Sequence, residues 1–133
     1  MKTNSKWLVG ALIGLHFTDL QAADWSPGAE QAFASGSRHF ESGDYDRALE
    51  QFRIAMEEGM RTVPVIYNIG VCQYRIGDYA GSELSFRRIA LEYPDWYHLA
   101  QYNIGLALIR QDRIEEAGRA FHEARNSDDT SVI

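Results

Sequence analysis

Cysteine, lysine and long apolar runs are scarce in this chain of 133 residues. Its single cysteine, Cys72, cannot close a disulfide within the chain, so helix packing must supply the stability of the fold. The apolar stretch from Trp7 to Leu15 is too short for the roughly 20 residues that a membrane-spanning helix needs. We therefore predict no membrane span.

Both lysines, Lys2 and Lys6, lie at the N-terminus, and the later strongly basic residues are all arginines. The chain as a whole is acidic, with a formal net charge of −6 at pH 7. Negative charge of this size repels the phosphate backbone of nucleic acids and the surface of anionic membranes. We therefore expect no nucleic acid among the partners of this protein.

The chain also lacks the residue groupings by which common catalytic and metal sites are recognised. It has no Ser-His-Asp grouping, no paired carboxylates with a histidine on one helix face and no phosphate-cradling glycine loop. The histidines His39, His98 and His122 have no ligand spacing to acidic residues or to the cysteine. The sequence therefore predicts a non-enzymatic protein without a metal site or cofactor.

What the chain does have is a period of 34 residues. The triplet Gly43-Asp44-Tyr45 recurs as Gly77-Asp78-Tyr79, and Phe52 recurs at the same interval as Phe86. A fixed period of this length is typical of stacked-repeat proteins. Because each repeat buries one face against the next, such arrays usually provide a binding surface rather than a reaction.

The period divides the chain into three units, each of which we interpret as two helices joined by a turn. The units cover residues 29–62, 63–97 and 98–130, and the second carries one extra residue near Trp96. Three such units are the usual minimum for a continuous core. The sequence therefore predicts an all-α fold, an α-solenoid of three helix-turn-helix repeats.

Small and large residues recur at fixed places in the three units. A small residue on each helix of a pair lets the two helices approach closely, and large apolar residues then fill the space around that point. An apolar residue that opens the second helix lies seven residues before a phenylalanine, so the two mark one buried stripe. The recurring sets are Gly36, Gly70 and Gly105; Ala48, Ser82 and Ala117; Tyr45, Tyr79 and Ile114; and Phe52, Phe86 and Phe121.

This pattern resembles the tetratricopeptide repeat (TPR). The second unit carries the resemblance most fully, through Tyr67-Asn68-Ile69-Gly70, Gly77-Asp78-Tyr79, Ser82, Phe86 and Pro94. The third unit departs from it, because Asp112 and Arg113 replace the Gly-Asp of the turn. A left-handed backbone conformation is energetically less favourable for residues other than glycine, so this third turn is the weakest part of the resemblance.

The N-terminal segment concerns the location of the protein rather than its fold. Two lysines, an apolar run and small residues at Ala22 and Ala23 are typical of a secretory signal peptide, cleaved after one of these alanines. An uncleaved anchor is the alternative interpretation. A periplasmic or secreted protein of bacterial type is therefore expected. The predicted segments are a signal peptide at 1–22, a linker at 23–28, a TPR domain at 29–130 and a tail at 131–133.

The resemblance implies that the first helix of each unit lines a concave groove. Two asparagines at matching places would form a ladder that pairs with the backbone of an extended peptide, and two arginines would bind carboxylates at one rim. The expected groove residues are Phe33, Ser37, Tyr67, Asn68, Val71, Tyr74, Arg75, Tyr102, Asn103, Leu106 and Arg110.

Each groove residue also has a structural interpretation. Tyr67 and Tyr102 can pack between neighbouring first helices, and the two asparagines can form a hydrogen bond between units. Arg75 and Arg110 can be solvated surface charges. At this point both interpretations stay open.

The resemblance implies a protein-binding adaptor of the bacterial cell envelope, with a protein or peptide partner held as an extended segment. The alternative is the periplasmic repeat region of an outer-membrane or polysaccharide-export protein that contacts a polysaccharide. We also expect an exposed apolar patch, and self-association, at the C-terminal repeat. Its candidate residues are Leu106, Ile109, Ile114 and Phe121.

Overall fold

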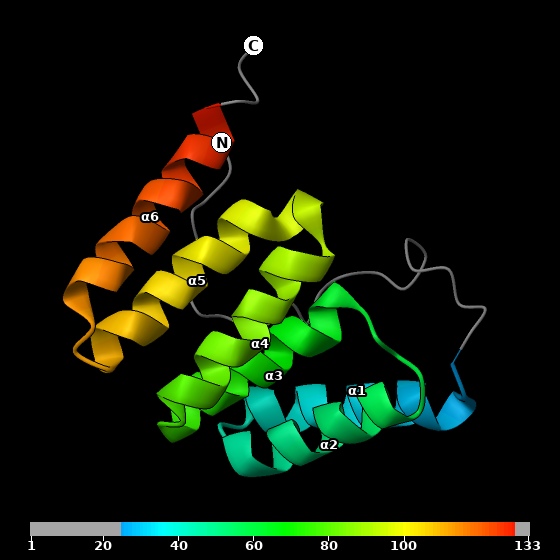
Figure 1. Cartoon of the computed structure of the whole chain (residues 1–133). Helices are drawn as coiled ribbons and strands as arrows, with labels where there is room; N and C mark the ends of the chain where they lie inside the picture. The colour runs from blue at the N-terminus through cyan, green and yellow to red at the C-terminus, as the bar shows by residue number, and fades with distance from the viewer. Residues whose placement is uncertain (1–24, 130–133) are drawn as a thin grey trace.

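The computed structural model of the chain describes residues 25–129, and this part consists of helices joined by short connections (Figure 1). No strand occurs in it. The predicted signal peptide and the C-terminal tail lie outside the described residues. The helices are α1 (Pro27–Glu41), α2 (Tyr45–Glu57), α3 (Val63–Ile76), α4 (Tyr79–Glu92), the short 3-10 helix η3 (Pro94–Trp96), α5 (Tyr97–Arg110) and α6 (Ile114–Asp129).

The helices pack in chain order, each one against the next. Figure 1 shows three hairpins in succession, from α1 and α2 through α3 and α4 to α5 and α6. The second helix of one hairpin also contacts the first helix of the following hairpin, so the hairpins form a continuous stack. The fold is the predicted all-α solenoid of three helix-turn-helix repeats.

The turns of the first two hairpins use the same backbone geometry. Gly43 and Gly77 have φ angles of 81° and 99°, a left-handed conformation that glycine adopts without steric cost. The aspartate that follows each glycine caps the next helix. Asp44 and Asp78 accept a hydrogen bond from the backbone N–H three residues later, at 3.3 and 2.9 Å.

The third turn keeps this shape with different residues. Asp112 takes the left-handed position with a φ of 60°, the one positive φ at a non-glycine residue among residues 25–129. Arg113 stands where the other units have their capping aspartate. Instead of capping, its guanidinium donates to Glu116 at 2.6 Å on its own helix and to Glu83 at 2.7 Å on α4. The turn therefore forms without glycine and gains a contact between units.

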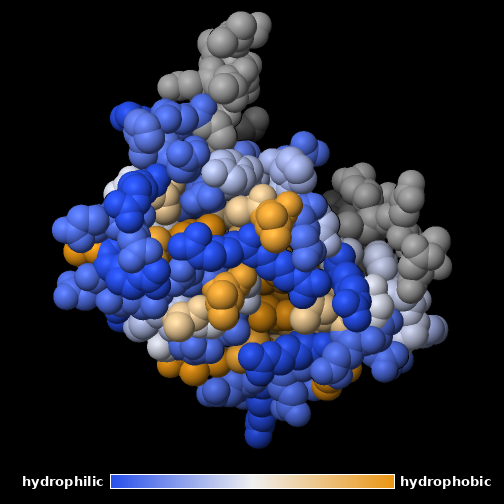
Figure 2. Space-filling model, in the orientation of Figure 1, coloured by the Kyte–Doolittle hydropathy of each residue, from blue (hydrophilic) through white to orange (hydrophobic). Residues whose placement is uncertain are grey.

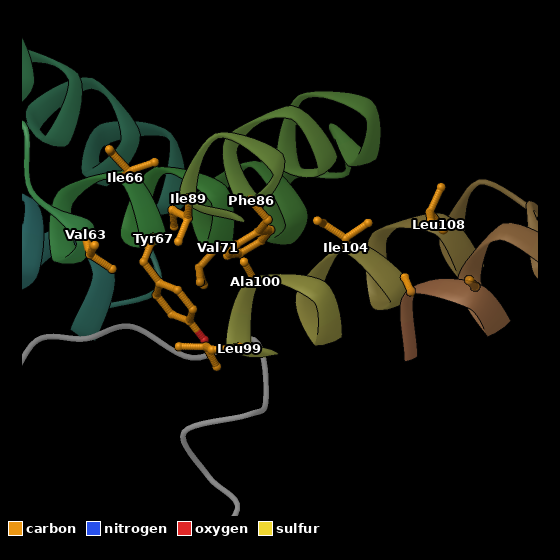
Figure 3. Close-up of a cluster of buried hydrophobic side chains, with 12 residues drawn as sticks. Val63, Ile66, Tyr67, Val71, Phe86, Ile89, Leu99, Ala100, Ile104 and Leu108 are labelled. Atoms are coloured by element: carbon orange, nitrogen blue, oxygen red, sulfur yellow. The ribbon is translucent and has the colours of Figure 1, made fainter. Parts of the chain in front are cut away.

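The core consists of two apolar clusters that share α3. Val65, Ile69 and Cys72 of α3 belong to the cluster of the first hairpin. Another side of α3 joins the cluster of the second and third hairpins, as Figure 3 shows for Tyr67 and Val71 beside side chains of α4 and α5. All eleven residues from Val63 to Gln73 are consequently buried.

The recurring glycines make room for the recurring phenylalanines. A Cβ atom placed on any of the three glycines would lie closer than 3.0 Å to the ring opposite, a separation that real Cβ atoms essentially never show. The shortest distances are 2.8 Å from Gly36 to Phe52, 2.9 Å from Gly70 to Phe86 and 2.5 Å from Gly105 to Phe121. The small residues of the second helices are also buried, and Ser82 donates a hydrogen bond to the Gly70 carbonyl at 2.8 Å.

The C-terminal end is less apolar than the sequence suggests. Ile109 and Ile114 are 44% and 52% exposed, whereas Leu106 and Phe121 are partly buried. Helix α6 runs through Asp129 and shields the stack with an outer face of polar and charged side chains. The expected patch is therefore limited to the two isoleucines. The exposed polar residues of α6 include Glu115, Arg119, His122, Glu123 and Arg125.

Candidate partner-binding site

The eleven groove residues predicted from the sequence divide into two groups. The first group is 0–8% exposed and comprises Phe33, Ser37, Tyr67, Asn68, Val71 and Asn103. The second group reaches the surface and comprises Tyr74, Arg75, Tyr102, Leu106 and Arg110. Buried side chains touch a partner only if the core opens. We therefore correct the role of the first group to packing, and the second group alone remains as candidate contacts.

The aromatic residues of the first helices pack against the phenylalanine of their own unit. Tyr67 lies 5.3 Å from Phe86 between ring centroids, with the rings at 72°. The equivalent pair in the third unit, Tyr102 and Phe121, is 5.5 Å apart. Aromatic pairs at this separation stabilise a core by about 0.5–1.5 kcal/mol beyond the buried area. Tyr67 thus packs on the second helix of its own hairpin, and it also shares an apolar cluster with Leu99 of the neighbouring first helix α5.

The asparagines do not form a ladder at the surface. Asn68 and Asn103 are both fully buried. The amide nitrogen of Asn103 donates to the carbonyl of Leu99, one turn earlier on α5, at 2.9 Å. This hydrogen bond lies within one helix, so for Asn103 it is neither the expected contact with a peptide nor the alternative contact between units.

Four of the five exposed candidates line one hollow, which we call the α3–α5 hollow, whereas Tyr102 does not line it. It has a volume of about 420 Å³. Tyr74 and Arg75 come from the end of α3, Tyr79 opens α4, and the other two side chains come from α5. Sequence reasoning placed Tyr79 in a buried stripe and did not include it in the groove. The hollow is lined by Tyr74, Arg75, Tyr79, Leu106 and Arg110.

Arginine stacked on tyrosine organises this hollow. The Tyr74 and Tyr79 rings meet edge to face at 5.2 Å and 71°. The guanidinium of Arg110 lies 4.5 Å from the Tyr79 centroid and 5.6 Å from that of Tyr74. A side-chain hydrogen bond with Tyr74 is the main reason that the pKa of Arg110 is raised above its ordinary value. The cation therefore stays charged and rests on an aromatic surface.

The same arrangement occurs one unit earlier. The Phe40 and Tyr45 rings meet at 5.1 Å and 71°, and the Arg75 guanidinium lies 5.6 Å from the Tyr45 centroid. We call these two arrangements, Arg75 on Tyr45 and Arg110 on Tyr79, the Arg–Tyr stations. In both, an arginine of one unit covers a tyrosine of the preceding unit. The recurrence of arginine and tyrosine at the repeat interval was a signal in the sequence that could have identified them.

The charge of the hollow is opposite to that of the chain. Its lining includes two arginines and no acidic residue, whereas the whole chain has a net charge of −6. Guanidinium groups donate in-plane hydrogen bonds that suit carboxylates, and the tyrosine and leucine side chains offer apolar contact area. The hollow can therefore bind an anionic group next to an apolar one.

A cluster of polar side chains around Glu83 connects the last two units. Glu83 is 7% exposed, and its carboxylate lies 2.7 Å from both Arg87 and Arg113 and 3.0 Å from the Gln111 amide. Burial raises the pKa of Glu83, but hydrogen bonds from Gln111 and Arg87 and the charges of Arg87 and Arg113 outweigh it, so the pKa is lowered. This cluster was missed because its members are far apart in sequence. The neighbouring arginines favour the ionised form of Glu83, and the role of this carboxylate is structural.

The described residues contain neither an ionised thiol near neutral pH nor a cluster of metal ligands. Cys72 is fully buried, and burial raises the pKa of its thiol to about 12, so the thiolate is not populated near neutral pH. Between residues 25 and 126, no three histidine, cysteine, aspartate or glutamate side chains gather as metal ligands. No helix of the described part is long and apolar enough to cross a membrane.

Two exposed leucines lie on α4, outside the hollow. Leu84 and Leu91 are 69% and 83% exposed. Figure 2 shows a mainly hydrophilic surface with separate hydrophobic side chains over α4 near the middle of the view. Neither leucine lines the α3–α5 hollow, so Leu84 provides a matched control for Leu106 in binding experiments.

Residues 33–97 match the family model described as tetratricopeptide repeat. These residues belong to the tetratricopeptide repeat family. The match covers most of the first unit and all of the second, and the third hairpin adds the same contact between glycine and phenylalanine. No curated protein matches the chain. Tetratricopeptide repeats generally mediate contacts between proteins and are typically not enzymes, which agrees with a site made for binding.

Proposed function

We propose that this protein is a non-enzymatic adaptor that binds an extended segment of a partner protein in the α3–α5 hollow. The observation that carries the proposal is the convergence of five aromatic, aliphatic and basic side chains from three helices on one hollow. Aromatic and arginine side chains are enriched among the residues that dominate protein–protein binding energy.

The proposal includes a location in the bacterial cell envelope. It is supported by the two N-terminal lysines and the apolar run from Trp7 to Leu15, which lie outside the described residues. Sequencing of the mature N-terminus after export would test this part. The protein would begin at Ala23 or Asp24, and a chain that retains its first residues in the cytoplasm would contradict the proposed location.

A polysaccharide partner is the alternative, and the site favours it less. Sugar rings bind proteins by stacking on open aromatic faces. In the hollow, Arg110 lies over the Tyr79 ring at 4.5 Å, and the Tyr74 ring meets Tyr79 edge to face. Because these neighbours crowd the ring, a protein segment suits the site better than a stacked sugar.

The proposal is tested by selecting peptides from a random displayed library on the full chain and then measuring their affinity for two variants. Leu106→Gln replaces an apolar contact inside the hollow, and Leu84→Gln makes the same change on α4. A lost leucine contact of about 1.4 kcal/mol weakens binding about tenfold. We expect this loss for Leu106→Gln and an unchanged affinity for Leu84→Gln.

Thermal melting of both variants serves as the folding control. Equal affinity of the selected peptides for the Leu106→Gln variant and the unmodified chain would place binding elsewhere. A library that yields no binding peptide would also count against the proposal.

A further inference from the structure

We infer that the partner segment carries two acidic side chains about three residues apart, one for each Arg–Tyr station. The inference rests on the proposed function and specifies the partner of the same site. It commits to an extended acidic protein segment as the occupant of the hollow.

The first step concerns the spacing of the two stations. Arg75 and Arg110 stand at equivalent positions of α3 and α5, and both line the hollow. These helices share one apolar cluster, and Figure 3 shows Tyr67 of α3 reaching toward Leu99 of α5. A compact hollow of about 420 Å³ is roughly 9 Å across, and an extended chain advances about 3.3 Å per residue. Three residues of an extended partner therefore span the distance between the stations.

The second step concerns the orientation of the charges. A guanidinium that stacks on a ring uses its face, while its N–H groups point outward in the plane. Arg110 is held in this way over Tyr79 and Tyr74, and it forms no ion pair with the carboxylates of residues 25–126. Its donors are thus positioned for the carboxylate of a partner, which they can bind through paired hydrogen bonds.

The third step concerns selectivity. An acidic chain repels acidic segments over most of its surface, but the lining of the hollow has two cations and no anion. Complementary charge within such a surface fixes where a partner binds and in which register. Leu106 and Tyr74 also line the hollow, so the residues between the two acids can be uncharged.

Three fluorescent nonapeptides with a shared background of valine and threonine test this inference on the full chain. The first has aspartates at its fourth and seventh positions, the second has asparagines there, and the third has aspartates at its fourth and fifth positions. Fluorescence anisotropy, with protein up to millimolar concentration, gives the affinities. We expect the first peptide to bind about tenfold more tightly than the second, and the third to lie between them.

The double variant Arg75→Ala with Arg110→Ala should remove the preference for aspartate. Its control is Arg53→Ala with Arg125→Ala, which removes the same charge from exposed positions outside the hollow and should keep the preference. Raising the salt concentration should reduce the preference as well, because partly exposed ion pairs are screened.

The outcomes separate this inference from the proposed function. Equal binding of the aspartate and asparagine peptides overturns the inference, as does the absence of binding by the diacidic peptide at millimolar concentration. Library peptides that lose affinity for Leu106→Gln would still uphold the proposed function in either case. Preserved preference in the double arginine variant overturns the inference too, because the acids would then bind elsewhere.

Discussion

The second and third hairpins share a framework but differ in how their turns and ends are stabilised. In the second, a glycine and a capping aspartate form the turn, and Phe86 is fully buried. In the third, Asp112 holds the left-handed position, Arg113 binds Glu83 of the preceding hairpin, and Phe121 is partly exposed. The central unit thus relies on close packing, whereas the terminal unit relies more on charged contacts with its neighbour.

This difference follows from the position of each hairpin in the stack. The second hairpin has a neighbouring hairpin on both sides, so its apolar side chains are removed from water. Its stability therefore depends mainly on how closely these side chains pack. The third hairpin has a described neighbour on one side, and its polar outer face limits the apolar area that it buries. The following predictions test whether the two hairpins differ in energy as they do in geometry.

The largest expected effect comes from removing the recurring phenylalanine. Phe86→Ala should lower the free energy of unfolding by about 3–5 kcal/mol, because a fully buried ring leaves a cavity opposite Gly70. Phe121→Ala should cost about 1–3 kcal/mol, because part of that ring already contacts solvent. Urea denaturation of the two variants measures both values. A larger loss for Phe121→Ala would contradict the proposed difference between the hairpins.

An intermediate effect is expected from the polar cluster around Glu83, which connects the two hairpins. Glu83→Gln should lower the free energy of unfolding by about 1–2 kcal/mol at pH 7, because the substitution removes the buried carboxylate that pairs with Arg87 and Arg113. Folding lowers the pKa of Glu83 below its ordinary value of 4.5, so its contribution is present above that pH and is lost as the pH falls below it. Denaturation at several pH values should therefore show the difference between variant and unmodified chain shrinking in acid.

The matched control for this prediction is Glu116→Gln. Its side chain is 40% exposed, although its carboxylate lies 2.6 Å from Arg113. An exposed pair of this kind contributes little to stability, so Glu116→Gln should lower the free energy of unfolding much less than Glu83→Gln. A difference for Glu83→Gln that stays constant from pH 7 down to acid would refute the role assigned to the charged carboxylate.

The smallest effect is expected at the left-handed turn positions. Asp112→Gly should stabilise the chain by about 0.5–1 kcal/mol, because glycine adopts a positive φ without the Cβ conflict. The reciprocal change Gly77→Ala should destabilise it by about 1–2 kcal/mol for the same reason. Chemical denaturation detects both shifts. If Asp112→Gly is destabilising, the side chain of Asp112 contributes more to the turn than its backbone conformation costs.

The framework could be predicted because it depends on contacts that recur in every unit. Gly70 and Phe86 lie 16 positions apart, and the same kind of pair appears in each hairpin. A steric requirement of this kind leaves a pattern in residue type, so the fold and the hairpin turns are visible in one sequence. The third turn shows that the pattern tolerates aspartate at the left-handed position.

The groove could be predicted only in part. Periodicity places Tyr67, Asn68 and Tyr74 on the first helix of a unit, but it does not say how far the neighbouring units cover that helix. In the structure the first two are buried, and Tyr74 reaches the surface. The contact between units that Arg113 makes with Glu83 joins residues 30 positions apart and does not recur at the repeat interval among the ion pairs of residues 25–126.

The sequence by itself determined the repeat, the six helices and the need for glycine opposite each phenylalanine, because these depend on the size of side chains within one hairpin. The tertiary structure decided which side chains remain available to a partner. Stacking covers Tyr67 and Asn68 and leaves Arg75 and Arg110 at the edge of a hollow. Availability depends on how neighbouring hairpins are placed against one another, and that placement is a property of the assembled stack.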